Sequence, residues 1–126
     1  MLDAREAMAT IAVKDLARAK KFYGDTLGLK EAGQEMDEEV AAYRSGKSTI
    51  VVYKSKFAGT NKATSATWGV GDELESIVGT LKKKGVAFEH YDMPGMTLEG
   101  DIHKFGEFRA AWFKDPDGNI LHINSE

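Results

Sequence analysis

The chain has 126 residues, of which 42% are hydrophobic and 29% charged, a composition typical of one ordinary globular domain and not of a disordered or fibrous protein. Its net charge of −3 argues against nucleic acid as a partner. The absence of cysteine excludes disulfides, thiolate metal sites and thiol nucleophiles. No apolar run is long enough for a signal peptide core or a membrane span, so we expect no membrane partner and a cytoplasmic location.

Two segments carry matching landmarks at a constant offset of 57 residues, which indicates an internal repeat. They are TIAVKDLARAKKFYGDTLGL and TWGVGDELESIVGTLKKKGV. In each copy a short alternating strand leads to an aspartate, Asp15 or Asp72, that is expected to cap a following helix. Apolar residues then follow at helical spacing, less cleanly in the first copy, and Gly28 or Gly85 suits the left-handed residue that ends a helix.

Segments with the alternation typical of strands follow each predicted helix. They are 30–32, 39–44 and 49–54 in the first copy, and 86–91, 108–113 and 120–124 in the second. Each half is therefore predicted to be a β-α-β-β-β unit, which makes the chain an α+β protein. We expect a single domain over residues 1–126, with module one at about 5–57 and module two at about 62–126.

The later landmarks match at a larger offset of 69, which aligns Ala41-Ala42-Tyr43 with Ala110-Ala111-Trp112. The extra residues fall in 92–107, where a proline and three glycines predict a loop. Longer loops often carry specificity, and Asp101, His103, Phe105 and Phe108 could form a lid. Asp101 and His103 could also share a metal or a proton, although a solvated loop is the alternative.

Together these segments resemble the vicinal oxygen chelate superfamily of glyoxalases, bleomycin resistance proteins and extradiol dioxygenases. The resemblance runs from Met8 to Ile123 and is most specific in VKDLARAKKFYGDTLGL and WFKDPDGNILHI. It implies tandem modules whose mixed sheet curls into a half-barrel around a cavity, with the helices outside. It also implies a homodimer.

Metal-dependent members of this superfamily carry ligands at four inward-facing strand positions. The residues at these positions are Met8, Val51, Ser65 and His122. Valine offers no lone pair, serine a neutral hydroxyl and methionine a soft thioether, whereas a catalytic zinc ordinarily needs three protein ligands. We therefore expect neither a metal nor another cofactor.

Strand alternation places one set of residues on the predicted inner face, while Trp68 is expected on the helix side. Including the loop, the candidate ligand-binding residues are Met8, Tyr43, Val51, Tyr53, Ser65, His103, Phe105, Trp112 and His122. His122 has three interpretations: a metal ligand, a ligand-contacting or proton-transferring group, or a hydrogen-bonded structural residue. Packing at the rim of the sheet is the alternative for Tyr43 and Trp112.

A cavity lined by apolar and aromatic side chains with a few polar groups is typical of a small-molecule site. The first hypothesis is a metal-free binding protein that sequesters an aromatic or apolar ligand. The alternative is a lyase, isomerase or dioxygenase-like enzyme that uses His122 as a general base or with a rebuilt metal site. A module that binds only a protein partner stays open, and so does the question of whether the chain is an enzyme.

Overall fold

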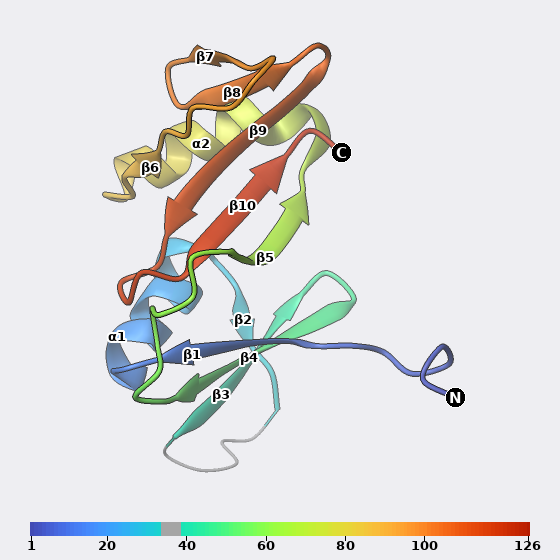
Figure 1. Cartoon of the computed structure of the whole chain (residues 1–126). Helices are drawn as coiled ribbons and strands as arrows, with labels where there is room; N and C mark the ends of the chain where they lie inside the picture. The colour runs from blue at the N-terminus through green and yellow to red at the C-terminus, as the bar shows by residue number, and fades with distance from the viewer. Residues whose placement is uncertain (34–38) are drawn as a thin grey trace. The chain divides into compact units, whose positions relative to one another are not determined.

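The computed structural model describes residues 1–33 and 39–126, which form two compact units (Figure 1). One unit consists of Met1–Lys62 with Pro116–Asn119, and the other of Ala63–Asp115 with Ile120–Glu126. Each unit contains a mixed sheet and helical segments, so the predicted α+β class with two tandem modules is confirmed. The assignment of both modules to a single domain stays a prediction.

The first unit has a four-stranded sheet in the order β1-β4-β3-β2. The pair β1–β4 is parallel, and the other pairs are antiparallel. Its elements in chain order are β1 (Ala9–Val13), α1 (Leu16–Lys20), a π-helical segment η1 (Lys21–Thr26), β2 (Lys30–Glu31), β3 (Val40–Ser45) and β4 (Ser48–Lys54).

The helix of the first unit begins as the sequence predicts and then departs from α-helical geometry. The Asp15 side chain accepts a hydrogen bond from the Arg18 amide at 3.2 Å, which confirms the cap. From Lys21 the chain adopts π geometry, and the Leu27 amide donates to the Phe22 carbonyl five residues earlier at 2.9 Å. The wider turn buries two consecutive aromatic side chains, Phe22 and Tyr23, which explains why the apolar spacing of this segment is irregular.

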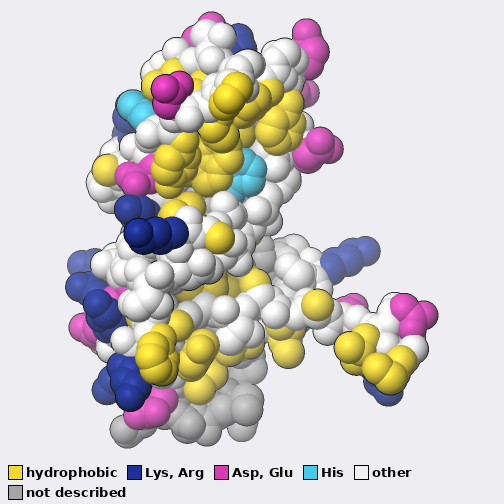
Figure 2. Space-filling model, in the orientation of Figure 1, with side chains coloured by type: hydrophobic (Ala, Val, Ile, Leu, Met, Phe, Trp, Pro, Cys, Tyr) yellow, Lys and Arg dark blue, Asp and Glu magenta, His cyan; other side chains and the backbone are white. Residues whose placement is uncertain are grey.

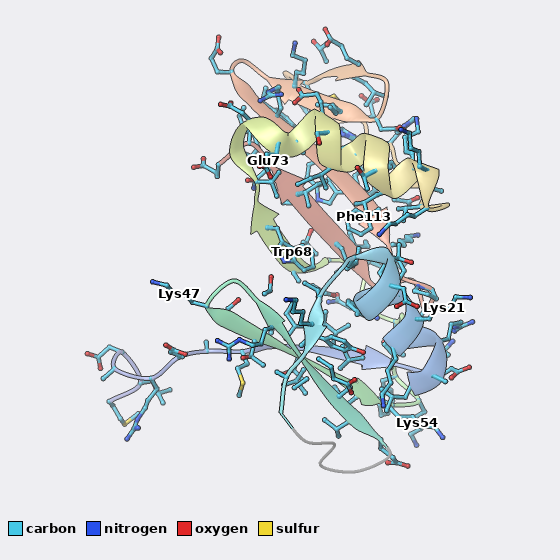
Figure 3. The ribbon with its side chains drawn as sticks, turned by 180° about the vertical axis from the view of Figure 1, so that it is seen from behind. Lys21, Lys47, Lys54, Trp68, Glu73 and Phe113 are labelled. Atoms are coloured by element: carbon cyan, nitrogen blue, oxygen red, sulfur yellow. The ribbon has the colours of Figure 1, made fainter. Side chains whose placement is uncertain are left out.

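The second unit has a six-stranded sheet in the order β5-β10-β9-β8-β7, and β6 also pairs with β9. Its α-helix α2 lies in front of this sheet when the unit is seen from behind (Figure 3). The elements are β5 (Thr64–Gly69), a 3₁₀ turn η2 (Gly71–Glu73), α2 (Leu74–Lys83), β6 (Phe88–Glu89), β7 (Thr97–Glu99), β8 (Ile102–Phe105), β9 (Phe108–Lys114) and β10 (Ile120–Asn124).

Two expectations for the second module are wrong. The Asp72 side chain does not cap α2, because the 3₁₀ turn carries the chain past it and α2 begins at Leu74 with no side-chain cap hydrogen bond. The segment 92–107 is not simply a loop, because β7 and β8 form a hairpin within it and β8 pairs with β9. Over the described residues, no helix is long and apolar enough to span a membrane.

Candidate functional site

The face of the second sheet opposite α2 carries a group of aromatic side chains. His122 on β10 pairs with Trp112 on β9, and His103 on β8 pairs with Ala110, two residues from Trp112. Because paired residues share a face, His103, Trp112 and His122 lie on the same side of the sheet. We call this side the aromatic face, and its members are Tyr91, His103, Phe105, Phe108, Trp112 and His122.

The other side of the sheet forms the core against α2. Ala111, Phe113, Leu121 and Ile123 alternate with the residues of the aromatic face, and all four are buried. Trp68 pairs with Ile123 and so belongs to this side, as expected. In the view of Figure 2, hydrophobic side chains gather around a histidine on the side of the second unit turned away from α2.

Trp112 lies at the centre of the aromatic face. Its ring stacks on that of His122, with centroids 4.4 Å apart and an angle of 27° between the planes. Two more rings lie nearly perpendicular to it, with centroid distances of 4.9 Å for His103 and 5.6 Å for Tyr91. Trp112 itself is only half-buried, so part of this aromatic surface is accessible.

A chain of hydrogen bonds fixes the proton of His122. The Glu126 amide donates to Asn124 Oδ1 at 3.1 Å, which turns Asn124 Nδ2 toward His122 Nε2 at 3.2 Å. Nε2 is therefore an acceptor, and Nδ1 carries the proton that is donated to the Ala111 carbonyl at 3.2 Å. Burial lowers the pKa of His122 below its usual value, and the hydrogen bond to Ala111 opposes this effect. His122 is thus a neutral imidazole with both nitrogens engaged.

His103 belongs to the sheet and not to a lid. It is 0% exposed on β8, and its Nε2 accepts a hydrogen bond from the Tyr91 amide at 2.9 Å. Burial lowers the pKa of His103, so this side chain is also neutral. The lid expected from the loop is therefore wrong for His103, because alternation along β8 turns this side chain onto the aromatic face, where it packs against Trp112.

Asp101 does not pair with His103. One carboxylate oxygen lies 2.7 Å from His90 Nε2, and the other lies 2.7 Å from Lys82 Nζ. Hydrogen bonds from Lys82 and His90 lower the pKa of Asp101. The shared metal or proton considered for Asp101 and His103 is not supported, because Asp101 joins α2 to the end of β6 instead.

The predicted site residues of the first unit lie on its open sheet face, with one exception. Val51 pairs with Thr10 on this side, Tyr53 is 37% exposed, and Met8, just before β1, is 58% exposed. Tyr43 instead faces the core, where it is 2% exposed and its ring lies 6.3 Å from that of Tyr23.

The predicted orientation of Tyr43 is wrong because the repeat was aligned one residue out of register. Val51 on β4 pairs with Ala42, just as His122 on β10 pairs with Trp112. Ala42 is therefore the counterpart of Trp112, and Tyr43 is the counterpart of the buried Phe113. A shift of one residue moves a strand side chain to the opposite face.

The first unit also contains a hollow of about 560 Å³ that is open to solvent. It contains Met8 but no aromatic side chain, and it is separate from the aromatic face. Its lining is formed by Glu6, Ala7, Met8, Lys47, Ser48 and Thr49.

The four positions that hold a metal in the superfamily do not have suitable residues here. The first unit supplies Met8 and Val51, and the second supplies Ser65 on β5 and His122. The lone pair of His122 Nε2 already accepts from Asn124, and the other three side chains are a thioether, an alkyl group and a neutral hydroxyl. In the part of the chain that the structure describes, no three His, Cys, Asp or Glu side chains gather as a metal site would require.

Two residues of the site were not predicted. Tyr91 reaches the aromatic face from the end of β6, and Asn124 sets the tautomer of His122. Asn124 could have been found from its spacing, because it lies two residues after His122 on the same strand face. The sequence carries no comparable signal for Tyr91, whose position depends on the hydrogen bond between its amide and His103.

Comparisons with known proteins agree on the fold. The family model described as Glyoxalase/Bleomycin resistance protein/Dioxygenase superfamily matches residues 7–123. The solved structure of UcmS2 has a TM-score of 0.74 at 18% identity, over 98% of each chain. A superfamily member from Sphaerobacter thermophilus DSM 20745 has a TM-score of 0.70 at 22% identity, over 100% of each chain.

A third similar structure is the fosfomycin resistance protein FosX from Mesorhizobium loti. It has a TM-score of 0.70 at 13% identity, over 100% of this chain and 94% of that chain. At these identities the likeness to solved structures concerns the fold alone.

Proposed function

The chain belongs to the glyoxalase/bleomycin resistance protein/dioxygenase superfamily, and we propose that it is a metal-free binding protein that holds a small aromatic or apolar molecule against the aromatic face. The stacked pair of Trp112 and His122 on an open sheet face is the observation that carries this proposal. A flat ligand extends this stack on the accessible part of Trp112. Each well-placed aromatic contact contributes about 0.5–1.5 kcal/mol beyond burial of area, so two or three support micromolar binding.

The charges around the aromatic face favour an uncharged ligand. His103 and His122 are neutral, and the nearest strand cations, Lys104 and Arg109, alternate onto the other side of the sheet. Lys114, two residues from Trp112, does share the aromatic face, but it is engaged at 3.1 Å with Glu89, which pairs with Trp112 on the same face. A phosphate or a coenzyme A ester would find no cationic partner among these groups.

The hydrogen bonds of His122 favour binding over catalysis. A general base needs an accessible lone pair within hydrogen-bond reach of the substrate proton. The lone pair of His122 Nε2 is directed at Asn124, and Asn124 is itself held by the Glu126 amide. A hydrogen-bonded structural role, which positions the imidazole under Trp112, is the interpretation of His122 that these contacts support.

We also expect a homodimer in the cytoplasm. Each sheet ends in a strand that pairs on one side within its sheet, β1 in the first unit and β5 in the second. Such edges are commonly covered by pairing or assembly, and a second copy of the chain offers the same edges in a symmetric arrangement. Light scattering near the 13.8 kDa of one chain at micromolar concentration would contradict the dimer.

The proposal can be tested with the two tryptophans, because they give only two indole N–H signals in a nitrogen-15 correlation spectrum. The ligands to titrate are neutral bicyclic aromatics, together with bleomycin and fosfomycin, which the family and structure names mention. We expect a neutral aromatic to shift the Trp112 signal saturably at micromolar to submillimolar concentration. The Trp68 signal should stay in place, because Trp68 lies on the α2 side.

Two variants serve as matched controls. Trp112→Ala should abolish saturable binding, measured by calorimetry, whereas Trp68→Phe should preserve it. The proposal is wrong if no aromatic ligand gives a saturable shift. Turnover of an α-oxoaldehyde thiol adduct that is lost with His122→Gln would favour the enzyme instead.

A further inference from the structure

The geometry points to a polar subsite within the aromatic face, an inference that rests on the proposed function. We propose that the Tyr91 hydroxyl is a donor that recognises an oxygen acceptor on the ligand. The ligand class is then a neutral aromatic carbonyl compound, such as an aryl ketone, quinone or lactone.

The first observation is that the Tyr91 hydroxyl is buried without a partner. Among the described residues, Tyr91 Oη has no hydrogen-bond partner, although the atom is inaccessible to solvent. The rings of Tyr91 and His103 belong to one group, with centroids 6.1 Å apart. A buried polar group without a hydrogen-bond partner is unfavourable, so an acceptor on a bound ligand would stabilise the complex by forming the missing hydrogen bond.

The second observation fixes the chemistry of the missing partner. Because His103 Nε2 accepts from the Tyr91 amide, the single proton of this neutral imidazole is on Nδ1, where it is engaged by the backbone of Ala110, so the hydroxyl of Tyr91 is the group that needs a partner. Burial, with Glu89 nearby, raises the pKa of Tyr91, so its hydroxyl stays protonated. A hydroxyl donor calls for an acceptor, and a neutral donor beside apolar rings favours a carbonyl oxygen over a carboxylate.

The third observation is that Tyr91 is held in place by two contacts with the inserted hairpin. Its amide is bound to His103 at 2.9 Å, and the preceding residue, His90, is bound to Asp101 at 2.7 Å. Asp101 is in turn fixed by Lys82 of α2 at 2.7 Å. The Tyr91 ring therefore stands against Trp112, where a molecule stacked on the indole directs its carbonyl toward the hydroxyl. Tyr91 as a whole is only half-buried, so part of this residue is accessible to solvent.

The test compares two ligands that differ by one carbonyl, 1-indanone and indane. Both are titrated into the wild-type chain, Tyr91→Phe and the control Tyr43→Phe, with the Trp112 indole signal as readout. We expect Tyr91→Phe to weaken 1-indanone about five- to ten-fold, as the loss of one hydrogen bond predicts. The same variant should change indane less than about two-fold, since no hydrogen bond is lost. Tyr43→Phe, which removes a hydroxyl from the core of the other unit, should leave both affinities unchanged.

The possible results distinguish a failure of the polar subsite from a failure of the proposed function. If both ligands bind and Tyr91→Phe affects them equally, the subsite is wrong and the aromatic site stands. If neither ligand binds the wild-type chain, the proposed function fails and the subsite with it. A ligand-free measurement adds an independent check: the urea midpoint of Tyr91→Phe should equal or exceed that of the wild type. A clear decrease would show that the hydroxyl already has a partner, and this would overturn the inference.

Discussion

The substitution Gly59→Ala should be among the most damaging single-methyl changes in the chain. Gly59 has a φ of 73°, and a Cβ added there would overlap the backbone carbonyl oxygen of Asp117 in the turn between β9 and β10. The left-handed conformation alone costs an L-residue about 1–2 kcal/mol. Overpacking against rigid backbone adds about 1–3 kcal/mol. The expected loss is therefore about 2–5 kcal/mol, a large part of the 5–15 kcal/mol typical of a small protein.

Urea unfolding followed by circular dichroism measures this loss, and Gly46→Ala is the matched control. Gly46 also has a positive φ, 58°, but nothing lies within 4 Å of a Cβ built there. The control should therefore lose only the conformational part, about 1–2 kcal/mol. Equal losses in the two variants would refute the reasoning, because the contact between the segment at Gly59 and the turn at Asp117 would then contribute nothing.

Four further predictions follow from contacts of single residues. Arg18→Ala removes the cation that lies 2.7 Å from the carboxylate of Asp117, whose side chain is 0% exposed. This variant should lower the free energy of unfolding by about 1–2 kcal/mol, a figure that allows for the exposure of Arg18. Asp117→Asn in the same background should recover part of this loss in urea unfolding. Burial holds the pKa values of His103 and His122 below the usual 6.5, so the unfolded chain binds more protons than the folded chain in mild acid. The urea midpoint should therefore fall as the pH drops below about 6.5. A midpoint that does not change with pH would contradict this prediction. Asn124→Asp places a carboxylate beside His122 Nε2 and should raise the pKa of His122 in a proton NMR titration, whereas an unchanged titration would disprove the hydrogen-bond pattern. Elemental analysis after exchange into zinc, nickel, manganese and iron should find no stoichiometric metal, and a one-to-one content lost with His122→Ala would contradict the metal-free proposal.

Local signals in the sequence predicted the framework of both modules. The Asp15 cap and the left-handed glycines Gly28 and Gly85 were found correctly, because each depends on a backbone requirement that a few neighbouring residues express. The Asp72 cap failed because the 3₁₀ turn before α2 depends on a tertiary arrangement, in which the Gly71 amide donates to the Glu126 carbonyl at 2.9 Å. The aspartate therefore caps the helix in the first module but not in the second, although it has the same place in both repeats.

The candidate site was predicted only where strand alternation could be read with a secure register. His122 and Trp112 share a face as expected, since the turn at residues 115–118 fixes the pairing of β9 and β10. Tyr43 failed because repeat matching, unlike strand pairing, allows an error of one residue. The hairpin holding His103 was missed because Gly100 and Gly106 were interpreted as loop residues, although both have the positive φ of tight turns at the ends of β8.

Trp112 corresponds to Ala42 in the first unit, and His122 corresponds to Val51. The first unit can therefore serve as a control for the second unit within the same chain. Both halves have the same strand pairing at these positions, and of the two only the second carries rings there. The first sheet therefore lacks the stacked pair, and the pair can be introduced there by substitution and compared with the native pair in the same molecule. Ala42→Trp combined with Val51→His would transplant the stacked pair to an equivalent strand pair. Any binding gained there would measure what the pair contributes alone, and the remainder would belong to the other residues of the aromatic face.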